Sequence, residues 1–327
     1  MAVLSMIEAI RGALTSEMER DERMMVLGQD VATLGGVFRA TDGLATRFGP
    51  ERVFDTPLAE SSIVGASVGL AASGLVPVAE IQFLGFAHVA FHQIAHQLAR
   101  LRYRSQGRLG CQVTIRAPFG GGVRALEIHS DAYEAMYAQV PGLKIAAPAT
   151  ARDAKGLLLA SIRDEDPVLF LEPLRGYRLV KDDVPDGDYT VELGQARVAR
   201  AGTDVTIVAW SGMVPVAERA AETLAAEGVS AEVIDLRSLV PLDVDTIVAS
   251  VVKTGRAVVV QEGPMTAGFA SEVVTSITEE AFYSLEAPVA RISGYDVPYP
   301  VGMLEEHYVP DAARVVAAAL RVCGEGA

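Results

Sequence analysis

The chain has 327 residues, of which 50% are hydrophobic and 21% are charged, and this length favours about two globular domains. Its net charge of −14 argues against a nucleic-acid partner or an anionic membrane surface, because both attract cationic faces. Two cysteines, Cys111 and Cys323, are too few for a disulfide framework, and no apolar run reaches the ~18 residues of a membrane span, so we expect a cytoplasmic location.

Helix and strand patterns alternate along the first half of the chain, which predicts a parallel sheet covered by helices. The N-terminus lacks the pattern of a secretory signal, because a helix capped by Ser5 begins almost at once. Residues 61–74 are rich in Ala, Gly and Ser, so we expect a tightly packed, buried helix there. The expected helices are 6–21, 44–48, 61–74, 86–104, 132–138 and 151–163, and the expected strands are 24–28, 53–56, 76–82, 112–118, 143–147 and 168–171.

A change in composition marks a boundary between two domains. Prolines, glycines and charges without periodicity fill residues 173–192. We therefore expect a first domain at 1–180, a linker at 181–192 and a smaller α/β domain at 193–327. In the second domain the expected strands are 203–210, 230–236, 256–262 and 287–294, and the expected helices are 214–227, 244–253, 270–282 and 311–322.

A single carboxylate, Glu60, stands at the start of the small-residue helix, directly after the strand 53–56 and Pro57. An acidic residue at this position commonly complements the helix dipole. The alternative is a functional carboxylate, whose burial would raise its pKa or require a specific partner. On this stretch alone, the helix-dipole interpretation is the ordinary one.

Three histidines, His88, His92 and His96, recur every four residues along the helix expected at 86–104. A pair of imidazoles at this spacing can share a metal ion, but three helical turns span more than ~10 Å, too far for one ion to touch all three. No carboxylate or cysteine stands at the usual ligand spacing. We therefore expect these histidines to serve packing or a subunit interface.

The three glycines of residues 120–122 follow a predicted strand and precede His129. They match neither the dinucleotide-binding fingerprint nor the P-loop. We expect them to allow a tight excursion that brings His129 to a pocket at the carboxyl end of the sheet, where α/β proteins bind ligands. A structural role for His129 beside the helix at 132–138 is the alternative. Phe83 and Phe86 either pack in the core or form an aromatic wall for a planar heterocycle.

The segment DGD at 186–188 superficially resembles the GDG motif of thiamine-diphosphate enzymes. That motif holds magnesium through an aspartate and, about one helix later, an asparagine. The chain contains no asparagine, and the segment lies in the expected linker, so we reject this motif.

An ordered set of segments resembles the β subunit of the thiamine-dependent component of 2-oxoacid dehydrogenases, within the transketolase-like superfamily. The resemblance extends from about residue 3 to 322. GYDVPYP (294–300) is more similar to the branched-chain (2-oxoisovalerate) members, whereas PFGGGV (118–123) also resembles bacterial pyruvate-type subunits. The segments are DTPLAES (55–61), EIQF (80–83), LRYRS (101–105), HSD (129–131), PGLK (141–144), DAKGLLL (153–159), EVIDLRSLVPLD (232–243) and KTGRAVVVQEGP (253–264).

The resemblance implies a transketolase-like α/β fold divided over two genes. This chain would carry the parallel-sheet pyrimidine-binding domain and the smaller C-terminal domain. A separate α subunit would hold the diphosphate and magnesium of the shared thiamine diphosphate, which agrees with the missing asparagine. Two α and two β chains would work around a core of lipoyl-bearing dihydrolipoyl acyltransferase.

The resemblance also implies roles for individual residues. Glu60 would hydrogen-bond a ring nitrogen of the cofactor's aminopyrimidine and begin its proton relay, and His129 would act as an acid near the lipoyl step. Phe86 would lie against the aminopyrimidine, with Leu58 and Gln82 lining the same pocket. A structural potassium ion would be held, mainly through backbone carbonyls, by Val113, Ser161, Ile162, Asp164 and Asp166.

We therefore expect an enzyme that decarboxylates branched-chain 2-oxoacids oxidatively and passes the acyl group to a lipoyl arm. A pyruvate dehydrogenase β subunit is the first alternative. A self-sufficient transketolase-type enzyme and a non-catalytic assembly module are the others.

Overall fold

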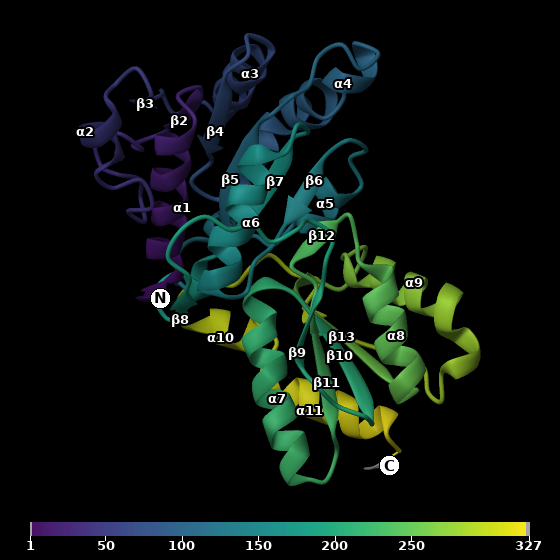
Figure 1. The fold of residues 1–327 in the computed structure, drawn as a ribbon. Coiled ribbons are helices and arrows are strands. Elements are labelled where there is room, and N and C mark those ends of the chain that lie inside the picture. The colour runs from purple at the N-terminus through teal and green to yellow at the C-terminus, as the bar shows by residue number, and fades with distance from the viewer. Residues whose placement is uncertain (1, 325–327) are drawn as a thin grey trace.

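The computed structural model describes residues 2–324 and has an α/β fold with two domains (Figure 1). The strands of this described part form sheets of seven, five and two strands. The expected α/β class with a parallel-sheet first domain and a second, smaller α/β domain is confirmed.

The seven-stranded sheet is the framework of the first domain, with strand order β12-β6-β7-β5-β4-β2-β3. Its strands pair in parallel except β12, which is antiparallel to β6 and comes from far along the chain. Sequence patterns did not indicate β12. The strands are β2 (Met24–Gly28), β3 (Val53–Asp55), β4 (Val76–Glu80), β5 (Thr114–Phe119), β6 (Lys144–Ala146), β7 (Val168–Pro173) and β12 (Ser238–Val240).

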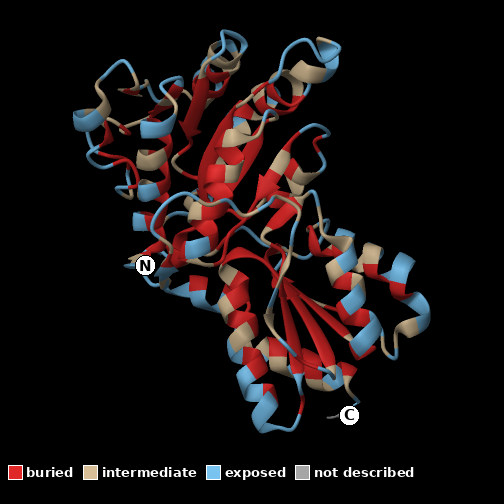
Figure 2. Cartoon of the chain, viewed as in Figure 1, coloured by how far each residue is buried: buried red, intermediate tan, exposed pale blue. Residues whose placement is uncertain are grey.

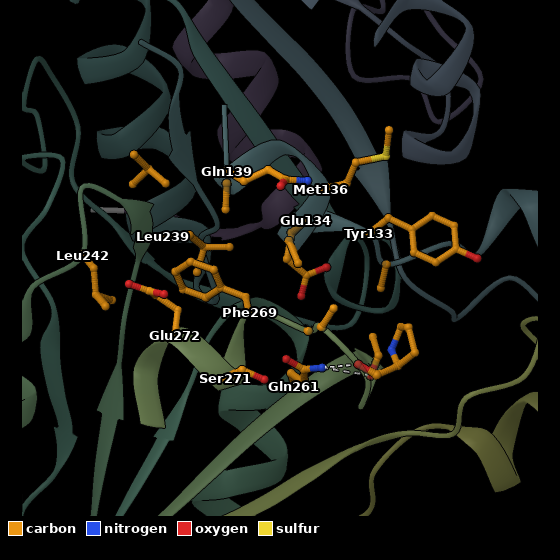
Figure 3. A pocket seen from close by; sticks show the side chains of 18 of the residues that line it. Tyr133, Glu134, Met136, Gln139, Leu239, Leu242, Gln261, Phe269, Ser271 and Glu272 are labelled. Atoms are coloured by element: carbon orange, nitrogen blue, oxygen red, sulfur yellow. Dashed lines mark hydrogen bonds between the residues drawn. The ribbon is translucent and has the colours of Figure 1, made fainter. Parts of the chain in front are cut away.

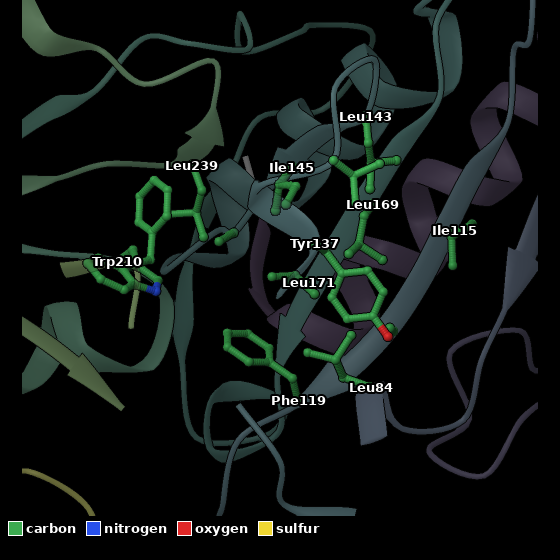
Figure 4. Packing of buried hydrophobic residues seen from close by; sticks show 14 of the residues in the cluster. Leu84, Ile115, Phe119, Tyr137, Leu143, Ile145, Leu169, Leu171, Trp210 and Leu239 are labelled. Carbon is green, nitrogen blue, oxygen red and sulfur yellow. The ribbon is translucent and has the colours of Figure 1, made fainter. Parts of the chain in front are cut away.

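Two helices, α1 (Met6–Arg20) and α6 (Ala151–Arg163), pack against each other and cover one face of this sheet. The first turn of α1 is closed by a capping box, because Glu8 accepts hydrogen bonds from the backbone and hydroxyl of Ser5. The opposite face packs on a larger hydrophobic cluster that continues into the second domain and includes Trp210 (Figure 4). The two domains therefore share one core.

Two expectations for this second face are wrong. The helix expected at 86–104 is a succession of a 3₁₀-helix η1 (Leu84–Ala90), a π-helix η2 (Gln93–Leu98) and α4 (Leu101–Arg104). The helix α3 (Glu60–Ala72) is not buried all round, because only Ile63, Val64 and Ser67 are buried against its neighbours β4, η1 and η2. Its other face is exposed (Figure 2).

The second domain is built on the five-stranded sheet, in which β9 is antiparallel to β11 and the other neighbours are parallel. Helices α7 and α11 pack together, as do α8 and α9. The elements are β9 (Arg197–Arg200), β10 (Val205–Ala209), β11 (Ala231–Asp235), β13 (Ala257–Pro264), β14 (Ala290–Gly294), α7 (Val214–Ala226), α8 (Val244–Thr254), α9 (Ala270–Ala281) and α11 (Ala312–Val322).

The linker expected at 181–192 contains the strand β8 (Lys181–Val184), which pairs antiparallel with β1 (Ala2–Ser5) at the N-terminus. The polar sequence KDDV gives no strand alternation, so its backbone pairing was not predictable from the pattern. The remaining elements are α2 (Leu44–Phe48), α5 (Glu134–Ala138), α10 (Glu305–Tyr308), η3 (Glu127–His129), η4 (Leu174–Gly176), η5 (Ser211–Met213), η6 (Phe282–Ser284) and η7 (Gly302–Leu304). No helix among residues 2–324 is long and apolar enough to cross a membrane.

Candidate active site

The strand order of the first sheet indicates where a ligand would bind, at the carboxyl ends of its strands. From β2 the chain crosses to β3 on one side, and from β4 it crosses to β5 on the other. Open α/β sheets bind ligands in the crevice at the carboxyl ends of strands where the winding reverses in this way. The loops that leave the carboxyl ends of β2, β3, β4 and β5 lead to Asp30, Glu60, Gln82 and His129.

Gln82 links two of these loops. Its Nε2 donates to Oδ2 of Asp30 at 3.2 Å, which ties the loop after β4 to the loop after β2. Asp55, at the end of β3, accepts from the backbone N–H groups of Ala32 and Thr33 at 2.7 and 3.1 Å. Three neighbouring loops are therefore fixed to one another by side chains.

Glu60 is the first residue of α3 and is partly buried. Within the described residues, its carboxylate has no hydrogen-bond or ion-pair partner. Leu58, two residues earlier, is 70% exposed, so this chain alone does not enclose the pocket that Leu58 is expected to line. The unpaired carboxylate of Glu60 and the exposed side chain of Leu58 are therefore both accessible to a ligand or to another chain.

His129 packs against Phe83 and Phe86, and of these two rings Phe83 belongs to the hydrophobic core. Its ring centroid is 4.6 Å from that of Phe83 and 5.1 Å from that of Phe86, both in edge-on contact. Its Nδ1 atom is buried and has no hydrogen-bond partner among the described residues. Helix α3 packs against η1, and η1 packs against η3, which carries His129, so the elements holding Glu60, Phe86 and His129 are contiguous.

Gly85 makes this approach possible. A Cβ atom at that position would lie 2.1 Å from the carbonyl oxygen of Ile128, so no larger residue fits without moving the His129 loop.

The loop before His129 is held by two carboxylates from the second domain. Glu262, at the end of β13, accepts from the backbone N–H of Gly121 at 2.6 Å and from the hydroxyl of Tyr299 at 2.9 Å. Glu305 accepts from the backbone N–H of Gly122 at 2.7 Å and of Arg124 at 3.1 Å. We call Glu262 and Glu305, with these bonds, the loop clamp.

The glycines predicted to permit a tight excursion make the clamp possible. A Cβ atom at Gly120 would meet the carboxyl of Glu262 at 2.7 Å, and one at Gly121 would meet the Tyr299 hydroxyl at 2.1 Å. Sequence analysis missed the role of Glu262 and Glu305. A signal was present for Glu262, because it is a charged residue shortly after the apolar run AVVV in the same strand.

A buried charge cluster joins the neighbouring strands β4, β5 and β7. The guanidinium of Arg116 donates to Glu172 at 2.7 and 2.9 Å and to Glu80 at 2.8 Å, and the Tyr177 hydroxyl also donates to Glu172. Burial raises the pKa of the Glu80 carboxyl, and Arg116 opposes that rise. A Cβ at Gly36 would come within 3.1 Å of Glu80, so the loop after β2 rests on this cluster.

The residues implied for a potassium ion lie around the start of β5 and the end of α6. The carbonyl of Ile162 accepts from Nε2 of Gln112 at 2.8 Å, and the carbonyl of Val113 accepts from the backbone N–H of Val168 at 3.0 Å. Both acidic members have basic partners: Asp164 pairs with Lys144, and Asp166 pairs with Arg102. Ser161 donates to a helix carbonyl. The potassium ion stays a prediction.

The three histidines of residues 88–96 are divided between two sets of ring contacts. His88 stacks on Tyr133 with ring centroids 5.3 Å apart, whereas His92 and His96 contact each other at 5.2 Å. In the described part of the chain, no group of three or more His, Cys, Asp or Glu side chains is placed to hold a metal ion.

Two protein-family models match the chain. The pyrimidine-binding domain of transketolase matches residues 2–180, and the C-terminal domain of transketolase matches residues 194–315. A pyruvate dehydrogenase E1 component subunit beta from Bacillus subtilis is 50% identical over 322 residues, which are 98% of this chain and 99% of the relative. The chain belongs to the E1 β subunits of 2-oxoacid dehydrogenases.

The family resemblance inferred from the sequence is thereby confirmed. A subunit of the same name from Staphylococcus epidermidis is 49% identical and covers 97% of each chain. Among solved structures, a split-gene transketolase described as an inactive β4 tetramer matches with a TM-score of 0.80 and 27% identity, covering 99% of each chain. These E1 β relatives share nearly the full length of the chain, including both domains described above.

The residues at the crevice fit thiamine diphosphate, the cofactor on which this family depends. An aminopyrimidine needs a carboxylate for a ring nitrogen, an amide for its amino group and a flat apolar surface. Glu60 is unpaired, Gln82 uses its Nε2 toward Asp30 and keeps its Oε1 for a donor, and Phe86 adjoins His129. The unpartnered Nδ1 of His129 is a further buried polar atom that a bound group can satisfy.

Proposed function

We propose that this chain supplies the pyrimidine half of a thiamine diphosphate site in a branched-chain 2-oxoacid dehydrogenase. The overall reaction releases carbon dioxide from the 2-oxoacid and transfers the remaining acyl group to a lipoyl disulfide, which is reduced to one thioester and one thiol. When bound, thiamine diphosphate supplies the nucleophilic carbon and the electron sink for this chemistry.

In this proposal the chain's own residues orient the cofactor and move protons. Glu60 hydrogen-bonds the aminopyrimidine ring nitrogen and holds the proton that the relay exchanges. Gln82 fixes the amino group, Phe86 supports the ring, and Leu58 is covered when a partner chain docks. His129, held by the loop clamp, serves as the acid at the lipoyl step. The observation that supports the proposal is the unpaired carboxylate of Glu60 on elements contiguous with Phe86 and His129.

The partner is the α subunit of the same enzyme, which would bring the diphosphate and magnesium groups. We propose an assembly of two α and two β chains around a lipoyl-bearing acyltransferase core in the cytoplasm. The chain contains no asparagine, so it cannot complete a magnesium motif of the thiamine type by itself. Calorimetry of thiamine diphosphate with the purified chain tests the rival, self-sufficient enzyme: tight binding and turnover without an α chain would establish it.

The role of Glu60 is tested in the assembled enzyme by Glu60→Gln, which keeps the shape of the side chain and removes its charge. We expect oxoacid decarboxylation to fall by about 10²–10⁴-fold, the usual effect of removing a general acid or base. Glu51→Gln, on an exposed residue nearby, is the matched control and should leave the rate unchanged. Near-normal decarboxylation by Glu60→Gln would remove Glu60 from the mechanism, and an assembly inert toward every 2-oxoacid would favour the non-catalytic alternative.

The substrate is the finer part of the proposal. The segment GYDVPYP favours branched-chain acids, and its Tyr299 contacts the loop clamp through Glu262. The relatives named pyruvate dehydrogenase support pyruvate as the second candidate. Specificity constants of the αβ enzyme for 3-methyl-2-oxobutanoate and pyruvate distinguish the two. Since one or two methylenes are worth ~1–3 kcal/mol, we expect a preference of about 10- to 200-fold for the branched acid.

A further inference from the structure

A cavity of about 950 Å³ lies between the two domains (Figure 3). Its walls come from α5 and the two residues before it, from β12 and the segment that follows it, from the end of β13, from the loop and first turns of α9, and from His88 of η1. Glu60, Gln82, Phe86 and His129 are not among the described residues that line it. Its volume is within the range of small-molecule sites in proteins, about 300–1,000 Å³.

The lining combines apolar side chains with negative charge. Met136, Leu239, Leu242 and Phe269 give the cavity apolar walls. Its charged side chains are carboxylates, and none of the described lining residues is lysine or arginine. Such a space fits a molecule with an apolar body and a positively charged head.

Glu134 supplies the group that such a head would meet. It is 2% exposed, and its Oε1 accepts from the indole N–H of Trp210 at 3.1 Å. Its Oε2 is buried without any hydrogen-bond partner among the described residues. Figure 3 shows the carboxyl directed into the cavity, with Phe269 on one side and Tyr133 on the other in that view.

An unsatisfied buried oxygen in a native protein requires an explanation, and a bound donor is one. Burial raises the pKa of the Glu134 carboxyl to about 7, so the group can give up its proton at small cost when a cation arrives. Aromatic faces such as those of Phe269 and Tyr133 also attract organic cations.

We propose that this cavity binds a small organic ammonium ion, whose N–H donates to Oε2 of Glu134 and whose apolar body packs on Leu239, Leu242 and Phe269. The inference does not depend on the proposed function, because its site and its readout lie outside the cofactor crevice.

Trp210 provides the measurement, because it is the only tryptophan of the chain and bonds to Glu134 directly. Benzylamine is titrated into the full chain while tryptophan fluorescence is recorded, with benzyl alcohol and benzoate as neutral and anionic analogues. We expect benzylamine to shift the emission in a saturable manner and to bind at least about tenfold more tightly than either analogue, as a charge-assisted hydrogen bond would give.

Two matched variants locate the effect. Glu134→Gln keeps an acceptor for Trp210 and removes the charge, and we expect it to weaken benzylamine binding about 10- to 100-fold. Glu272→Gln removes the same charge from an exposed residue of the lining, and we expect a change below about twofold. If Glu134→Gln fails to fold, Leu242→Lys places a competing ammonium in the cavity and should abolish binding.

Several results would overturn the proposal. These are no saturable response to benzylamine, equal affinity for benzyl alcohol, or unchanged affinity in Glu134→Gln. Displacement of benzylamine by the α chain would also overturn it, because the cavity would then be a subunit contact rather than a site for a small ion.

Discussion

Arg116 shows what a single buried charge does in this fold. Its side chain is completely buried, and its single positive charge pairs with two carboxylates, Glu80 and Glu172, on the strands at either side. A buried ion pair can contribute little net stability, yet removing one partner leaves uncompensated charge in a low-dielectric interior. The loop after β2 rests on the same cluster, so Arg116 also supports the candidate crevice.

We therefore predict that Arg116→Met lowers the free energy of unfolding by about 3–5 kcal/mol, the cost of breaking a buried pair. The measurement is urea denaturation followed by circular dichroism. Arg47→Gln is the control, because the Arg47–Glu19 pair is exposed on both sides and should change stability by less than about 1 kcal/mol. If the two variants lose similar amounts, the cluster does not stabilise the sheet.

The sequence held a signal for this cluster that periodicity alone did not use. Glu80, Arg116 and Glu172 are isolated charges within the otherwise apolar stretches VPVAE, TIRAP and LFLEP. A charge in a strand that is buried on both faces needs a partner of opposite sign. Which strands are neighbours depends on the sheet order, and spacing along the chain does not give that order.

At the scale of elements, the four-residue helix α10 holds the loop that leads to His129 in place. Its first residue, Glu305, accepts hydrogen bonds from two backbone N–H groups of the loop that leads to His129. The side chains of Val123, Leu126 and Ile128 in that loop are exposed. Without this carboxylate, two loop amides lose their acceptor.

We predict that Glu305→Ala loosens the loop, and that trypsin then cuts the Arg124–Ala125 bond about tenfold faster, as expected for the loss of hydrogen bonds to a charged group. Mass spectrometry of timed digests identifies the cut. Glu306→Ala is the matched control, because Glu306 pairs with the exposed Arg124 side chain and accepts no hydrogen bond from a loop amide among the described residues. Equal digestion of both variants would contradict the clamp.

Elements that depend on nearby residues were predicted well, and elements that depend on distant contacts were not. The helix α6 has the expected bounds, because its cap residue Thr150 and its apolar spacing are local. The path from Leu84 to Arg104 departs from a regular α-helix, and at Gly85 it lies against Ile128, which is more than 20 residues away in the chain. Local residue spacing carries no information about such a long-range contact. Glu60 and His129 were reached through resemblance to a family, and their roles remain predictions.

At the scale of the whole molecule, Glu134 joins the domains, because it lies in α5 of the first and bonds Trp210 of the second. Burial raises its pKa from an ordinary 4.5 to about 7. A raised folded-state pKa means that the folded protein binds the proton more tightly. The protonated Glu134 carboxyl therefore makes its full contribution to folding stability below about pH 4.5, and this contribution is lost as the pH rises through about 7.

Glu134→Gln should therefore be more stable than the wild type at pH 8 by roughly 1–3 kcal/mol, since each unit of pKa shift corresponds to about 1.4 kcal/mol. At pH 5 the difference should be smaller than at pH 8, below about 1 kcal/mol, because most of the loss occurs between pH 5 and pH 7. Urea titrations monitored by Trp210 fluorescence at both pH values give the comparison. Glu227→Gln, at an exposed residue, is the control, and its free energy of unfolding should differ from that of the wild type by the same amount at pH 5 and pH 8. A difference for Glu134→Gln that does not change with pH would contradict this prediction.

The strand β12 has a consequence for how the protein is made. It supplies the edge of the first sheet beside β6, yet the ribosome synthesises Ser238–Val240 long after Lys144–Ala146. At the usual 5–20 residues per second, β6 waits roughly 5–20 seconds with a bare edge before its neighbour is synthesised. Nascent chains that stall in this interval present an unpaired strand to one another, so slow translation between the two segments should favour aggregation.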